Sequence, residues 1–124
     1  SLKNIKKFFK TKKIKFLILG LTFKENCVDY RNSKSIELVE KLRSKKIQTD
    51  CYDPLINIEE FSKNHKIKVL KKINLNYYHC CIIAVGHNFF KNLGESKIRS
   101  FLVKKGLIFD IKNIFPNNKN NIYL

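Results

Sequence analysis

The chain has no methionine or tryptophan, and its 124 residues include only four glycines and two prolines. None of the glycines has the G-x-G-x-x-G spacing of the turn that opens an ordinary dinucleotide-binding unit. This absence excludes an NAD-binding domain of the usual kind. The lack of methionine agrees with a chain that is a fragment of a longer protein.

The four cysteines lack C-x-x-C spacing, and two of them are adjacent in an apolar stretch whose successive side chains would face opposite sides of a strand. This pattern argues against a zinc site and against a disulfide framework. We therefore expect free thiols, in a cytoplasmic protein without a metal site, at Cys27, Cys51, Cys80 and Cys81.

Long apolar runs are also missing, since runs such as Cys80–Val85 are far shorter than the roughly 20 residues of a membrane-spanning helix. The N-terminus is basic but has no apolar signal-peptide core. Residues Ser1–Lys13 combine spaced apolar side chains with many lysines. They predict a short amphipathic helix that forms half of an interface, and no membrane partner.

Arginine is scarce in an otherwise strongly basic chain. The formal net charge is +16, yet of the 26 basic residues only Arg31, Arg43 and Arg99 are arginine. Clustered arginine would be expected for bidentate contacts to bases or phosphates. We interpret the dispersed lysines as solvated surface and predict no nucleic-acid partner. A nucleic-acid-binding basic domain stays as an alternative.

Apolar runs alternate with helical patterns along the chain. The runs predict strands at Ile14–Leu19, Ile47–Tyr52, Tyr77–Val85 and Leu107–Asp110. With helices between them, the fold class is α/β, a Rossmann-like three-layer sandwich with a mainly parallel sheet. The loops that follow these strands should share one edge of the sheet.

Helical spacing predicts three helices within this domain, at Ser35–Ser44, Ile56–Asn64 and Lys97–Lys104, the last capped by Gly106. Ile67–Leu70 is either a short strand or a turn. The Asn-rich stretch Asn117–Asn121 should be a loose surface tail.

The segment from Gly20 to Ser33 is the loop at the carboxyl end of the first of these strands, where open α/β sheets bind ligands. Gly20 permits close backbone approach, and Lys24, Arg31 and Lys34 bring cations to a helix N-terminus that already favours anions. The combination predicts a phosphate-bearing ligand. The alternative is a solvated loop.

Several polar positions carry two interpretations. Asn32 or Ser33 would cap the helix if the loop is only connective. Asp53 follows the second strand, where an acidic residue can hold a ribose hydroxyl, but Asp before Pro54 also starts turns. His87 lies where a ligand would bind, and a single histidine in a loop is also commonly a hydrogen-bonded structural residue.

Four ordered motifs resemble those of one enzyme family. They are Gly20–Asn26 with Asp29 and Arg31-Asn32-Ser33, then Tyr52-Asp53-Pro54, Ala84-Val85-Gly86-His87 and Phe109-Asp110-Ile111-Lys112-Asn113. The set is similar to the C-terminal domain of the UDP-glucose/GDP-mannose dehydrogenase family, most of all to the branch that oxidises UDP-N-acetylhexosamines. The likeness extends over residues 14–115.

The resemblance implies part of an NAD-dependent UDP-sugar 6-dehydrogenase that supplies surface-polysaccharide precursors. Residues 1–13 would be a linker or the end of a central helix, residues 14–115 the UDP-sugar-binding C-terminal domain and residues 116–124 a tail. The other domains of the same enzyme would make most of the contacts with NAD and would contain the catalytic cysteine. The complete enzyme would be a homo-oligomer. The fragment alone should be inactive and contain no catalytic residue.

The resemblance also assigns roles to individual residues. Phe23, Lys24 and Lys112 match positions that contact the UDP-sugar, and Arg31 matches one that reaches the NAD pyrophosphate. Relatives usually carry proline at the position of Val28, an aliphatic residue at Tyr30 and often alanine at Gly86. The alternative from another functional class is a non-catalytic nucleotide-binding or regulatory module.

Overall fold

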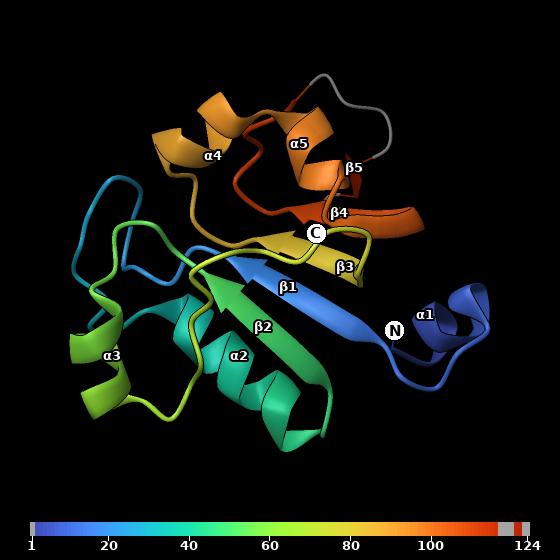
Figure 1. Ribbon diagram of the computed structural model, residues 1–124, viewed down its shortest axis with the longest axis horizontal. Coiled ribbons are helices and arrows are strands. Elements are labelled where there is room, and N and C mark those ends of the chain that lie inside the picture. Colours follow the sequence, from blue (N-terminus) through green and yellow to red (C-terminus); the bar gives the residue numbers. More distant parts are fainter. Residues whose placement is uncertain (1, 117–120, 123–124) are drawn as a thin grey trace.

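The computed structural model describes residues 2–116 and 121–122 (Figure 1). The elements in chain order are α1 (Leu2–Phe9), β1 (Lys15–Leu19), α2 (Lys34–Ser44), β2 (Gln48–Tyr52), α3 (Ile58–Asn64), β3 (Tyr78–Ile83), α4 (Asn88–Leu93), α5 (Glu95–Arg99), β4 (Leu102–Asp110) and β5 (Asn121–Ile122). The sheet has the order β2-β1-β3-β4-β5, and all neighbouring strands are parallel. The predicted Rossmann-like α/β sandwich is confirmed.

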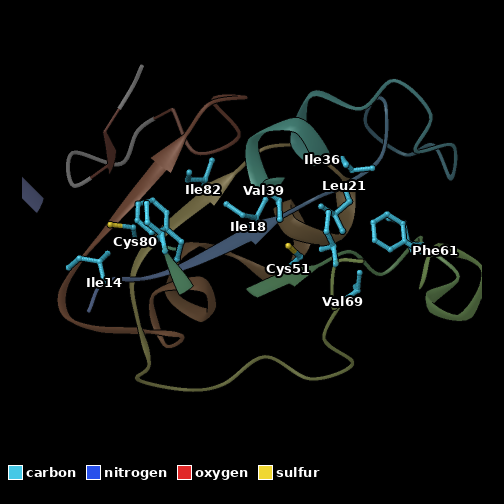
Figure 2. Packing of buried hydrophobic residues seen from close by; sticks show 14 residues of the cluster. Ile14, Ile18, Leu21, Ile36, Val39, Cys51, Phe61, Val69, Cys80 and Ile82 are labelled. Atoms are coloured by element: carbon cyan, nitrogen blue, oxygen red, sulfur yellow. The ribbon is translucent and has the colours of Figure 1, made fainter. Parts of the chain in front are cut away.

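The continuous apolar run of β1 reflects a strand that is covered on both faces. Phe16 and Ile18 pack with the helices α2 and α3, in the cluster that Figure 2 shows. Leu17 and Leu19 face the other way and pack with α4 and α5. The two helical layers lie on opposite sides of the sheet in Figure 1.

The predicted C-terminal helix and strand were misplaced. Helix α5 ends at Arg99 rather than Lys104, and β4 already begins at Leu102. Tyr78 pairs with Leu102 but Cys80 pairs with Leu107, so residues 103–106 stand opposite one residue of β3. Gly106 lies inside this irregularity, where a Cβ would be 2.6 Å from the Leu102 Cβ. It therefore permits a close approach within a strand and does not cap a helix.

Helix α4 was not predicted, whereas the boundaries of the other predicted elements agree to within a few residues. The stretch Ile67–Leu70 forms an isolated bridge to β2 through Val69. Of the predicted loose tail, residues 117–120 lie outside the described residues, whereas Asn121 begins the edge strand β5. No helix in the described part of the chain is long and apolar enough to cross a membrane.

All four cysteines are free thiols. Burial raises the pKa of Cys51 and of Cys80 to about 12, and it raises the pKa of Cys81 as well. These three thiols are therefore protonated at neutral pH, and a protonated, buried thiol is a poor nucleophile.

His79 gives a pH-dependent contribution to stability. Its Nδ1 accepts the backbone N–H of Lys15 at 3.0 Å, and its ring lies edge-on to Phe9 with 5.0 Å between ring centres. Burial, and secondly the charge of Lys15, lower the pKa of His79 below its ordinary value of 6.5. A lowered histidine pKa means that the folded state favours the neutral ring.

We therefore expect the His79 contribution to be complete above about pH 6.5 and to be lost as the pH falls through the lowered pKa. Proton NMR of the imidazole C–H resonances should give His79 a midpoint below 6.5. His79→Phe should remove this part of the acid dependence of the unfolding free energy. A midpoint above the ordinary value would contradict the assignment of a neutral, accepting ring.

Candidate functional site

The site lies at the edge of the sheet where the parallel strands end. There the Gly20 N–H donates to the Tyr52 carbonyl at 2.9 Å, and the Ala84 N–H donates to the Leu19 carbonyl at 2.9 Å. Gly86 packs against Lys112, whose Cβ would be 3.4 Å from an added Cβ. The segments after β1, β2, β3 and β4 thus lie next to one another, as the parallel fold predicts.

A buried hydrogen-bond network joins three of these segments. Asp53 accepts the Leu21 N–H at 2.7 Å and faces His87 Nε2 at 3.0 Å, both through Oδ2, and its Oδ1 accepts the Leu55 N–H at 2.9 Å. The Asp53 and His87 side chains are almost completely buried, with exposed fractions of 0% and 1%. Asp53 therefore has the turn-forming role, and both of its oxygens are engaged within the domain.

The protonation of His87 follows from its partners. Its Nδ1 lies 2.9 Å from the backbone nitrogen of Asn26, whose N–H can only donate. Nδ1 is thus the unprotonated nitrogen, and Nε2–H points at Asp53 and at the hydroxyl oxygen of Thr22, 3.2 Å away. His87 is accordingly a hydrogen-bonded internal residue. It is buried in the domain and does not face an open cleft.

The network holds the two ends of a short exposed tip of the loop. Thr22 touches His87 and donates its hydroxyl to the Lys24 carbonyl at 3.0 Å. Asn26 is held by His87 through its N–H and by the Asn88 N–H through its side-chain oxygen at 2.8 Å. Between these two anchors lie the exposed residues 23–25, including Phe23 with 60% of its surface exposed.

The second half of the loop leads into α2. Ser33 is the N-cap, since its side-chain oxygen accepts the Ile36 N–H at 3.4 Å, and Asn32 precedes it with a positive φ of 58°. Tyr30 packs on the Phe61 ring at 5.0 Å and bonds to Asn64. The added bulk of Tyr30 therefore attaches the loop to α3.

Arg31 and Asp29 form an ion pair at the surface of this loop. Arg31 Nη2 lies 2.8 Å from Asp29 Oδ2, and Nε also bonds to the carboxylate. The hydrogen bond from Arg31 holds the pKa of Asp29 at about 2, below its usual value. The pair orients the guanidinium while 84% of the Arg31 side chain stays exposed.

The pair borders a cleft of about 850 Å³ between the loop and the helices α2 and α3. Its lining includes Arg31, Ser33, Glu37, Glu60 and His65. Phe23, Lys24 and Lys112 do not belong to this lining. The residues that the resemblance assigns to the UDP-sugar therefore lie outside this cavity, whereas Arg31 borders it.

Residues 17–117 match the family model described as "UDP-glucose/GDP-mannose dehydrogenase family, UDP binding domain". This match covers most of the sequence. The chain belongs to the UDP-glucose/GDP-mannose dehydrogenase family. Among the similar proteins, the UDP-N-acetyl-D-glucosamine 6-dehydrogenase of Salmonella typhi is 35% identical over 120 residues, 97% of this chain. The enzyme of the same name from Pseudomonas aeruginosa is 34% identical over 108 residues, 87% of this chain.

A solved structure of the UDP-N-acetyl-mannosamine dehydrogenase Cap5O from Staphylococcus aureus superimposes with a TM-score of 0.72 at 25% identity, covering 98% of this chain. The chain spans only 28% and 26% of the lengths of the Salmonella and Pseudomonas relatives and 27% of the Cap5O chain. The similarity between this chain and its relatives therefore covers only about a quarter of each relative.

The residues assigned to the UDP-sugar and the residue assigned to NAD lie in different places in the structure. Phe23 and Lys24 lie on the tip that follows β1, and Lys112 lies beside Gly86 at the end of β4. Arg31 lies on the far half of the same loop, on the cleft toward α3. Neither Lys24 nor Lys112 forms an ion pair with any described residue, so both ammonium groups are available to an anion.

Sequence reasoning singled out Asp53 and His87 but not their partners Thr22 and Asn26. Thr22 and Asn26 stand in the first motif, and their polar side chains flank the Lys24 position at equal distance. The spacing alone did not reveal their role, because their partner His87 lies 65 and 61 positions away in the sequence.

Proposed function

We propose that this chain is the C-terminal, UDP-sugar-binding domain of an NAD-dependent nucleotide-sugar 6-dehydrogenase. The complete enzyme would oxidise the C6 alcohol of a UDP-N-acetylhexosamine or of UDP-glucose to the uronic acid. The observation that carries the proposal is the Lys24 tip, which bears the family motif and is anchored at the ligand-binding edge of a parallel sheet. The similarity to UDP-N-acetyl-D-glucosamine 6-dehydrogenases supports the substrate class.

The proposed division of labour gives residues 14–115 the diphosphate-binding role. Residues 1–13 would connect to a preceding central helix, and residues 116–124 would be a tail. The catalytic cysteine and most NAD contacts would come from the rest of a cytoplasmic homo-oligomer that makes surface-polysaccharide precursors. Purified as this chain alone, the domain should show no NAD reduction with any UDP-sugar.

The charges suit two different anions. Lys24 and Lys112 are exposed and form no ion pair with a described residue, which favours charge-assisted hydrogen bonds to a diphosphate. The exposed Phe23 precedes Lys24 on the tip. Arg31 keeps its Nη1 group free of hydrogen bonds to described residues while Asp29 holds the other two nitrogens. An oriented guanidinium with a free edge fits a pyrophosphate, so Arg31 is the residue that would reach NAD, whose nicotinamide accepts the hydride.

The two assignments can be separated by paired substitutions in the full-length polypeptide. Lys24→Ala should reduce kcat/KM for UDP-N-acetylglucosamine by roughly ten- to hundredfold, because a charge-assisted contact of about 1.5 to 3 kcal/mol is lost. Arg31→Ala should instead raise the KM for NAD. The readout is initial-rate kinetics with each substrate varied at saturating levels of the other.

The melting temperatures of both variants serve as the control for folding. Unchanged kcat/KM for the UDP-sugar in a folded Lys24→Ala protein would remove this tip from the mechanism. Binding of UDP to a full-length protein that never reduces NAD would favour a non-catalytic nucleotide-binding module.

A further inference from the structure

The imidazole of His87 makes its polar contacts with the loop that carries Lys24 and with the carboxylate of Asp53. Nδ1 accepts from Asn26, and Nε2 faces Thr22 and Asp53. Its remaining described ring contact is the Phe90 ring, 5.6 Å away between centres. Thus its ring face packs in the core, and its two nitrogens face the site.

We propose that His87 is a positioning residue for substrate binding. It holds both ends of the tip Phe23-Lys24-Glu25, through Thr22 and Asn26. The inference rests on the proposed function, because it assigns a role to Lys24 as the group that contacts the UDP-sugar. It adds that the Lys24 backbone is held in place by the hydrogen bonds through which the His87 ring joins the two sides of the tip.

The geometry of the tip supports a positioning role. One imidazole touches Thr22 on one side of the three exposed residues and Asn26 on the other. Asp53 accepts both the neighbouring Leu21 N–H and the imidazole proton, so the β2 end fixes the orientation of the ring. A lysine on a long flexible side chain gains most from a fixed backbone, because little else within the tip restricts it.

The chain supplies a matched control in His79. His79 lies in β3 and His87 is the N-cap of α4, and each accepts a backbone N–H through Nδ1, at 3.0 Å for His79 and 2.9 Å for His87. His79 serves Lys15 at the start of β1, at the opposite edge of the sheet from the tip. A merely structural imidazole at either position should affect stability and leave substrate affinity unchanged.

The test uses the full-length polypeptide with UDP-N-acetylglucosamine and NAD as probes. His87→Phe keeps an aromatic ring but removes both nitrogens, and it should raise the KM for the UDP-sugar by about tenfold or more while the KM for NAD changes less than about twofold. His87→Gln can present an oxygen to Asn26 and an amide N–H to Asp53, so it should recover part of the affinity. His79→Phe should leave both KM values unchanged.

Asn26→Gly provides a second variant in case His87→Phe does not fold. Asn26 is exposed and has a φ of 58°, which glycine adopts without strain, so this change removes only the side-chain bond from Asn88. It should also raise the KM for the UDP-sugar. When either variant is combined with Lys24→Ala, little further affinity for the UDP-sugar should be lost, because each change acts through the contact between Lys24 and the UDP-sugar.

The outcomes separate the two levels of the account. If Lys24→Ala lowers kcat/KM while His87→Phe and Asn26→Gly keep the wild-type KM, the positioning role is overturned and the proposed function stands. If Lys24→Ala itself has no effect, the proposed function fails first. A His79→Phe variant with the same rise in KM as His87→Phe would also overturn the positioning role.

Discussion

Gly20→Ala is expected to lower the free energy of unfolding by about 2 to 5 kcal/mol, the sum of a steric and a conformational cost. An added Cβ would lie 2.5 Å from the Val85 Cβ and 2.9 Å from the Val85 backbone nitrogen. Val85 is itself buried just beyond the end of β3, so neither atom can move without shifting the segment that leaves the strand. The φ of +98° at Gly20 adds backbone strain for any L residue.

Gly94 supplies the control, because its φ is +89° but nothing lies within 4 Å of an added Cβ. Gly94→Ala should therefore cost only the conformational part, on the order of 1 kcal/mol. Urea unfolding of both variants measures the difference. Equal losses in the two variants would contradict the claim that close packing of β1 on β3 requires Gly20.

Asp53→Asn should be strongly destabilising although the two side chains have the same shape. Asparagine keeps one oxygen, so its amide group would meet a second donor, either the Leu55 N–H or the Leu21 N–H with the His87 proton. His87 cannot simply exchange its proton, because Nδ1 must accept from Asn26. Even the better orientation, with the amide toward Leu55, loses one charge-assisted hydrogen bond and brings two donors together, which should cost about 2 to 4 kcal/mol.

Asp29→Asn is the matched control. The Asp29 carboxylate also accepts hydrogen bonds, from Arg31 in the loop after β1, but it lies at the surface. Thermal denaturation should show a large drop in melting temperature for Asp53→Asn and little change for Asp29→Asn. Screened surface ion pairs contribute little to stability. A small effect at Asp53 would mean that the network tolerates a missing acceptor.

Local patterns predicted much of this fold. The apolar runs of β1 and β3 are long because both faces are covered, and α2 begins at a serine cap that sequence reasoning had offered as one of two. The patterns predicted a parallel sheet but not the order of its strands, in which β1 lies between β2 and β3.

The failures are those of long-range contacts. Ile98, Phe101 and Leu102 have helical spacing, yet pairing with Tyr78 draws Leu102 into β4. The helix prediction was wrong because strand pairing with a distant residue outweighed a short local pattern. The contacts of His87 with Thr22 and Asn26 join residues 65 and 61 positions apart, so no local pattern could assign them.

The same limit applies to the ligand site. The motif placed Phe23, Lys24, Arg31 and Lys112 near one edge, but the structure directs Arg31 toward α3 and leaves Lys24 on the anchored tip. The direction in which each cation points depends on contacts made by neighbours such as Tyr30 and Asn26. Those contacts are tertiary, and spacing alone does not encode them.

The central claim is that this domain binds the diphosphate of a UDP-sugar through the tip after β1. Titration of the isotopically labelled chain with UDP, followed by two-dimensional amide NMR, tests it residue by residue. The account predicts weak binding, with a dissociation constant on the order of 1 mM. The largest changes in amide chemical shift should occur within residues 20–33 and at Lys112. Uridine without the diphosphate should produce much smaller changes. Shift changes confined to other surfaces, or equal effects of uridine and UDP, would contradict the claim.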